Sequence, residues 1–304
     1  MMSNTKRIYV TLDTEMDSDS HWIKHYPANY TSVTAGIHEL LRPIWDKYQV
    51  HPIYFVSPEV LYDDACVEAL KSEIDKGAVI GAHLHPEYIE PDNIFGEGME
   101  KVKPQFPCFG YTDEIEYEKL RNLTNLIQQK LSVKPMWYRA ARFGADNATI
   151  ASLYKLGYQY DSSVTPGIDW SGKGGPNHTN GLHRPYRISK YNMYKEADSE
   201  EEFSGIKEFP VTISDKRLGI IGKMLPDHWL FYRWLRPTHM TYIELKNMML
   251  QMERQGIQEG VMMFHSMEIM INKTPYVRNK WMQKYYLWRL EKAIKYAAML
   301  GYQL

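Results

Sequence analysis

The sequence predicts a single α/β domain, covering residues 1–304, in which strands and helices alternate. Short apolar runs are followed by longer segments in which apolar residues recur at the spacing of one helix face. The chain has 304 residues and 44% hydrophobic content, enough for one large core, and we find no linker and no internal repeat in it. The alternation indicates about six or seven β-α units, whose helical crossovers join parallel strands.

The apolar runs predict strands at residues 8–12, 52–56, 78–82, 135–138, 159–160, 209–213 and 261–264. Helical spacing predicts helices at residues 34–48, 63–76, 111–131, 147–156, 242–255 and 277–300. Glycines 77, 157 and 256 follow three of these helices, because glycine readily adopts the conformation that ends a helix. Two segments, 86–110 and 166–208, lack periodicity and are predicted to be long loops that shape a substrate groove.

The composition and charge of the chain indicate which classes of partner and location to expect. There are 36 basic and 37 acidic residues, a balance that does not favour binding to nucleic acid or to a membrane. The N-terminus lacks the long apolar region of a signal peptide, and no apolar run reaches the length of a transmembrane helix, so we expect a cytoplasmic protein. The two cysteines, Cys66 and Cys108, match no metal or redox motif and are predicted to be packing or surface thiols.

Four polar clusters each follow a predicted strand directly. They are Asp13-Thr14-Glu15, His83-Leu84-His85-Pro86-Glu87, Arg139-Ala140-Ala141-Arg142-Phe143-Gly144, and His265. In a barrel of parallel strands the C-terminal strand ends meet at one face, and enzymes of this architecture place their chemistry there. Carboxylates, imidazoles and arginine gathered at such a face predict a metal-dependent hydrolase.

Asp13 and Glu15 are two residues apart, so on an extended segment they point to the same side. Two close carboxylates do not ionise independently, which suggests that one is a metal ligand and the other a general base. A solvated acidic turn is the alternative, since Asp17 and Asp19 follow.

His83 and His85 have the same spacing, and imidazole is a common ligand of Zn²⁺. Two histidines and one carboxylate leave coordination positions open for water, as in catalytic zinc sites. Glu87 is a competing oxygen ligand, and a His-x-His pair also arises by chance in loops.

Arg139 is placed to hold the Asp13 carboxylate through a bidentate pair, although two arginines after a strand also fit a surface loop with salt bridges. Phe143 and Gly144 could present a backbone N–H to an oxyanion. His265 is a candidate general acid, with a buried core histidine as the alternative.

These clusters, in this order, resemble the motifs of the polysaccharide deacetylase family, which carries the NodB-homology domain. The segments that carry the resemblance are 11–15, 81–86, 138–144, 161–163, 209–211 and 264–266. The runs His83-Leu84-His85-Pro86 and 162–167 look similar to a subset of the family found with surface-polysaccharide biosynthesis.

The resemblance implies a distorted (β/α) barrel with about seven parallel strands and hydrolysis of an N-acetyl group on a carbohydrate. It implies a divalent metal, Zn before Co, Ni or Mn. The implied roles are Asp13 as base, Glu15 and His83 as metal ligands, Arg139 as the group that orients Asp13, His265 as acid, and Phe143, Arg142 and Asp161 as substrate or oxyanion contacts.

This sequence departs from the commonest family motifs in two places. Thr14 separates the two carboxylates, the second of which is Glu, and the histidines are two apart instead of four, with Glu87 in the fourth place. The third ligand is therefore His85 or Glu87. A hydrolase of a small amide or formamide on the same fold and a non-catalytic glycan-binding protein remain alternatives.

Two aromatic segments have no assigned chemistry. The helix at 277–300 is expected to cap the barrel bottom or to form a dimer contact, and residues 229–234 to form a groove wall or a core helix.

Overall fold

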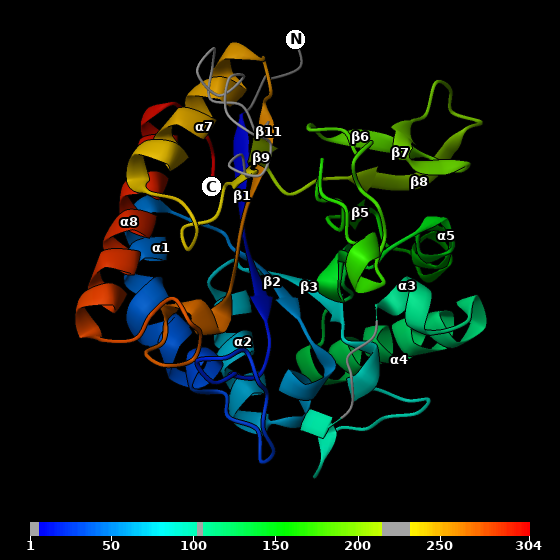
Figure 1. The fold of residues 1–304 in the computed structure, drawn as a ribbon, viewed down its shortest axis with the longest axis horizontal. Helices are drawn as coiled ribbons and strands as arrows, with labels where there is room; N and C mark the ends of the chain where they lie inside the picture. Colours follow the sequence, from blue (N-terminus) through cyan, green and yellow to red (C-terminus); the bar gives the residue numbers. More distant parts are fainter. Residues whose placement is uncertain (1–5, 102–105, 215–231) are drawn as a thin grey trace.

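The computed structural model describes residues 6–101, 106–214 and 232–304 (Figure 1). Nine strands form one sheet in the order β11-β1-β2-β3-β4-β5-β8-β6-β7. The first seven strands of that order are parallel: β11 (Glu259–His265), β1 (Arg7–Thr14), β2 (Ile53–Val56), β3 (Val79–Leu84), β4 (Trp137–Ala140), β5 (Tyr160–Asp161) and β8 (Phe203–Glu208). The sheet curls into a half-barrel with helices on its outside, which confirms the predicted distorted (β/α) barrel.

The longer helices cover the outer face of the sheet. They are η1 (Ser32–Leu41), α1 (Arg42–Tyr48), α2 (Asp64–Asp75), α4 (Asp113–Leu131), α5 (Asn147–Leu156), α7 (Tyr242–Arg254) and α8 (Lys280–Met299). A further one-turn helix, α3 (Pro107–Gly110), directly precedes α4. The predicted helix at 34–48 is therefore divided, with wide π-type turns in η1 and Pro43, which lacks an N–H, in the first turn of α1. Within the described ranges, no helix is both long and apolar enough to cross a membrane.

The segment 166–208 is not one long loop. Its second half forms β6 (Tyr186–Ser189), β7 (Asn192–Glu196) and β8, and the strand predicted at 209–213 is displaced to 203–208. Strands β6 and β7 pair antiparallel at the edge of the sheet. Both mix apolar and polar residues, so a search for continuous apolar runs misses them. Pro210 lacks the N–H that a ladder requires, so the chain leaves the sheet there.

The gap between β8 and β11 is bridged by individual hydrogen bonds. The N–H of Thr212 donates to Val261 O over 3.1 Å, and the N–H of Leu235 donates to Thr212 O over 2.8 Å. A two-stranded pair of β9 (Ile213–Ser214) and β10 (Arg233–Trp234) lies beside this gap. Residues 229–231 lie outside the described residues, so the expectation for 229–234 is tested only at residues 232–234, of which Arg233 and Trp234 form β10 and no helix is present.

Helix α8 packs along the side of the barrel and does not cap its bottom. Its buried face consists of Tyr286, Leu290, Ala293, Ile294 and Ala297. The residues after it reach the N-terminal end of the barrel, where the N–H of Ile8 donates to Gln303 O over 2.9 Å. Both cysteines are free and buried, as expected of packing residues.

Candidate active site

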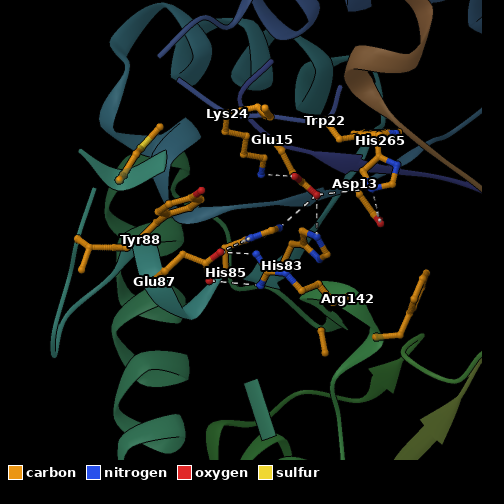
Figure 2. Close-up of a pocket in the computed structure, with 15 residues that line it drawn as sticks. Asp13, Glu15, Trp22, Lys24, His83, His85, Glu87, Tyr88, Arg142 and His265 are labelled. Carbon is orange, nitrogen blue, oxygen red and sulfur yellow. Dashed lines mark hydrogen bonds and ion pairs between the residues drawn. The ribbon is translucent and has the colours of Figure 1, made fainter. Parts of the chain in front are cut away.

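The four polar clusters meet in one cavity of about 390 Å³ at the C-terminal ends of β1, β3, β4 and β11 (Figure 2). Strand register brings them together, because Asp13 lies opposite His265 and His83 lies opposite Arg139. The predicted site residues on its lining are Asp13, Glu15, His83, His85, Glu87, Arg142, Phe143 and His265. Parallel pairing in this register therefore converts motifs that are far apart in sequence into one site.

Glu15, His83 and His85 form a buried cluster. Glu15 Oε1 lies 3.2 Å from His83 Nε2 and 3.2 Å from His85 Nε2. The Nδ1–H of His83 donates to Arg139 O over 2.8 Å, which leaves Nε2, on the Glu15 side of the ring, as the nitrogen that would bind a metal ion. His85 Nε2 is buried, and its contact with Glu15 Oε1 lacks the geometry of a hydrogen bond, so no described residue satisfies it as a hydrogen-bond partner. An orphaned nitrogen beside a carboxylate and a second imidazole fits the donor set of a divalent metal.

Glu87 lies on the side of the His85 ring opposite to Glu15 and His83. Its Oε1 lies 3.4 Å from His85 Nδ1, and the same carboxylate forms an ion pair with Arg142. Burial alone would raise the pKa of Glu87, but His85 and Arg142 outweigh it and hold that pKa well below its usual range. His85 Nε2, and not Glu87, therefore lies together with Glu15 and His83, while Glu87 contacts the opposite nitrogen of the His85 ring.

Arg139 is buried and supports Asp13. Its Nη1 donates to Asp13 Oδ1 over 2.7 Å and to Thr11 Oγ1 over 3.0 Å, while Nε and Nη2 donate to the carbonyl and hydroxyl oxygens of Ser162. The predicted bidentate pair is wrong, because Thr11 and Ser162 take the remaining donors. Burial alone would raise the pKa of Asp13, but Arg139 and the nearby histidines outweigh it and lower that pKa.

The ring of Phe55 lies under Arg139, with the guanidinium carbon 4.3 Å from the ring centroid. Gly81 on β3 makes room for this ring, since a Cβ there would lie 2.6 Å from Phe55 Cδ1. The guanidinium is thus held by the aromatic ring and by its hydrogen bonds.

His265 lies at the cavity edge and is partly exposed. Its Nε2 is 3.9 Å from Asp13 Oδ2 and 3.7 Å from Glu15 Oε1. Its Nδ1–H donates to Glu268 Oε1 over 2.8 Å, and Glu268 also forms an ion pair with Arg236. Burial alone would raise the pKa of Glu268, but Arg236 and His265 outweigh it and lower that pKa to about 2.

Sequence reasoning missed Glu268 and Arg236. Glu268 follows His265 by three residues, a spacing that one turn of the helix η8 (Ser266–Ile269) brings together, so it could have been found. Arg236 comes from the bridge across the barrel gap, and the sequence contains no local signal for its position.

The segment 17–30 supplies two further wall residues that sequence reasoning missed. Lys24 Nζ lies 2.5 Å from Glu15 Oε2, and the Trp22 ring packs edge-on against His265 at 5.4 Å between centroids. Burial alone would lower the pKa of Lys24, but Glu15 outweighs it and raises that pKa. Lys24 thus occupies one oxygen of Glu15 and leaves Oε1 facing the histidines, as Figure 2 shows.

Arg142 and Phe143 both have left-handed backbone angles, with φ of 56° and 61°. Such strain in residues other than glycine costs roughly 1–3 kcal/mol each and tends to concentrate at functional sites. The Phe143 ring forms a cavity wall against Trp170 and Trp234.

Asp161 is not on the cavity lining, which corrects the expectation that it contacts substrate. It is buried, accepts a hydrogen bond from Ser163 Oγ over 2.6 Å, and is held at a raised pKa by burial. Ser163 Oγ in turn accepts from the N–H of Ala140, so Asp161 supports the end of β4 from behind.

No protein-family model matches the chain, and no curated protein matches its sequence. Solved structures do match. One, from Parabacteroides distasonis and described as a glycoside hydrolase/deacetylase, has a TM-score of 0.62 at 8% identity, over 98% of this chain and 68% of the other. Another, from Mycobacterium smegmatis and described as a polysaccharide deacetylase, has a TM-score of 0.49 at 14% identity, over 99% of this chain and 86% of the other. At such identities the first match establishes a shared fold.

Proposed function

We propose that this protein is a metal-dependent hydrolase that removes an N-acetyl group from an amino sugar or glycan. The observation that carries the proposal is the Glu15, His83 and His85 cluster, which opens into the cavity beside Asp13 and His265. Two imidazoles and one carboxylate fit Zn²⁺, with Co²⁺, Ni²⁺ and Mn²⁺ as alternatives. When bound, such an ion supplies Lewis acidity for the acetyl carbonyl and the attacking water.

The residues around the cluster would handle the protons. Asp13, kept ionised by Arg139, accepts the proton of the attacking water. His265, whose Nδ1–H is held by Glu268, presents Nε2 to the cavity and delivers a proton to the leaving nitrogen. The two groups stand 3.9 Å apart at their nearest atoms, so one substrate amide can reach both.

The shared fold supports this proposal, since the P. distasonis protein is described as a glycoside hydrolase/deacetylase. The resemblance of the sequence motifs to polysaccharide deacetylases adds the N-acetyl substrate. A second candidate is hydrolysis of a small amide or formamide, and the modest cavity walled by Trp22, Lys24 and Phe143 favours it. A cavity near the lower end of the ligand-site range admits a single sugar ring or a small amide.

Elemental analysis of the purified chain and of His83→Ala tests the metal assignment. We expect about one divalent ion in the parent and a loss of at least tenfold in affinity in the variant. His51→Ala removes an exposed histidine at the opposite end of the barrel and should keep the ion. Equal metal content in parent and His83→Ala would refute the ligand set.

Acetate release from N-acetylated sugars, compared with release of acid from simple amides and formamides, then distinguishes the two candidate reactions. A chain that binds no ion after Zn²⁺ or Co²⁺ is offered, and that hydrolyses neither class, would favour a non-catalytic glycan-binding protein.

A further inference from the structure

The outer face of α8 exposes large apolar side chains in one line. Trp281 and Met299 are each 71% exposed, and Trp288 is 45% exposed. Together with Tyr285 they recur at i, i+4, i+7 and i+18, which places them on one side of the helix along its whole length. Within the described ranges, these two tryptophans are the exposed ones. Figure 1 shows α8 at the outer edge of the molecule, with α1 on its inner side.

The aromatic rings form a continuous surface. Trp281 and Tyr285 have centroids 5.6 Å apart and planes 6° apart, and Tyr285 and Trp288 have centroids 5.8 Å apart and planes 18° apart. Tyr242 at the start of α7 meets Trp288 at 6.0 Å, and its neighbour Ile243 is 67% exposed. This surface is separate from the core, to which α8 contributes its opposite face. Contiguous exposed apolar surface of this kind usually marks an interaction site.

Basic side chains flank the rings. Helix α8 carries Lys280, Lys284, Arg289, Lys292 and Lys295 against a single acidic residue, Glu291. Glu291 is engaged by Lys47 of α1 over 2.6 Å. Across the described residues, Lys280, Lys284 and Lys295 form no ion pair with a carboxylate. Although the whole chain has a net charge of −1, the basic residues of α8 form a local basic stripe, which the overall charge balance did not indicate.

We propose that the outer face of α8 docks on a lipid bilayer that carries anionic headgroups. Tryptophan and tyrosine rings settle at the boundary between headgroups and acyl chains, since they are apolar with one polar edge. Lysines beside them reach the negative headgroups while their aliphatic stems lie along the apolar surface. The stripe supplies both components along one helix, so it matches an anionic bilayer in charge and in polarity.

Other occupants fit the stripe less well. In a twofold contact between two copies of α8, the lysines of each copy would face those of the other, and like charges oppose association. A neutral glycan would stack on the rings but would leave the lysines without partners. The bilayer is the occupant that uses both kinds of side chain.

The stripe begins beside the active-site end of the barrel. Gln283 in the first turns of α8 donates to Ile269 O over 2.9 Å, and Ile269 belongs to η8, directly after His265. A bound bilayer would therefore lie alongside the barrel and close to the cavity. The docking proposal does not depend on the proposed function, because it requires no turnover and no metal.

Co-sedimentation of the full chain with vesicles tests the proposal. One set contains equal parts of phosphatidylglycerol and phosphatidylcholine, and the other contains phosphatidylcholine alone. We expect binding to the anionic set that weakens as salt rises. Trp281→Ser with Trp288→Ser should reduce binding at least tenfold, and Lys284→Gln with Lys295→Gln should reduce it about fivefold for each lysine.

Tyr191→Ser is the matched control, because Tyr191 is 67% exposed and lies on the edge hairpin, away from α8. Circular dichroism establishes whether each variant folds. If the double tryptophan variant does not fold, the double lysine variant still tests the proposal. Absence of binding to anionic vesicles, or equal binding by both α8 variants and the parent, would overturn the proposal. A dimer in sedimentation velocity that the tryptophan variants dissociate, without vesicle binding by the parent, would assign the face to a second copy instead.

Discussion

The two ends of the barrel are built from the same parallel strands, yet they bury different chemistry. At the C-terminal end, Arg139 and Asp13 form an ion pair whose side chains are 0% and 3% exposed. At the N-terminal end, Lys207 and Glu259 form an ion pair that is 33% and 28% exposed. That end also has a cavity, of about 500 Å³, lined by four packed aromatic rings: Tyr9, Trp137, Tyr160 and Phe209.

The comparison indicates that the N-terminal end of the barrel serves stability and that the C-terminal end serves function. Ring packing at the N-terminal end stabilises the barrel without removing a charge from water. Burying charges at the C-terminal end carries a desolvation penalty that apolar residues would avoid, so a chain that retains them there has another use for them. Mutations that remove a charge at each end test this distinction.

The largest expected effect is on turnover. Asp13→Asn removes the proposed base while keeping the shape of the side chain, so we expect acetate release to fall by about 10²–10⁴-fold with the metal retained. Glu259→Gln makes the same chemical change at the other end and should leave turnover unchanged. Acetate release on the best substrate measures both, and an active Asp13→Asn would remove Asp13 from the base role.

The next effect is on stability. Arg139→Met leaves Asp13 buried without its partner, and we expect the free energy of unfolding to fall by about 3–5 kcal/mol. Urea denaturation measures this loss. Adding Asp13→Asn to Arg139→Met should recover part of it, because the buried charge is then gone. A loss below about 1 kcal/mol would mean that Asp13 finds another partner.

A pH-dependent effect follows from Glu268. Its pKa in the folded chain is about 2, below the ordinary value of 4.5, so the ionised form contributes stability above pH 4.5 that is lost as pH falls towards 2. Glu268→Gln should therefore cost about 3 kcal/mol at pH 7, and its difference from the parent should shrink between pH 4.5 and pH 2. Denaturation midpoints across that range report the difference, and a constant difference would contradict the assignment.

The smallest effect is expected at the N-terminal end. Lys207→Gln breaks an ion pair that solvent screens, so the free energy of unfolding should fall by less than about 1 kcal/mol. Metal content and turnover should match the parent. A loss as large as that of Arg139→Met would show that the two ends do not differ in the way proposed.

Local sequence patterns anticipated much of the fold. Apolar runs marked β1, β2, β3 and β11 because strands buried on both faces read as continuous apolar segments. They failed at β6, β7 and β8, because each of these strands mixes apolar and polar residues instead of forming a continuous apolar run. The pairing of Asp13 with Arg139 was anticipated in its partners but not in its geometry, since Thr11 and Ser162 compete for the same guanidinium.

The order of residues along the chain is enough to show which chemical groups stand at the strand ends, because each motif follows its strand directly. How those groups contact one another depends on the folded arrangement of the strands. Strand register places Asp13 beside His265. Lys24 forms an ion pair with one oxygen of Glu15, and Glu87 lies between Arg142 and the Nδ1 side of His85. These choices depend on side chains that are distant in sequence competing for the same donors and acceptors, and such competition is settled only when the barrel closes.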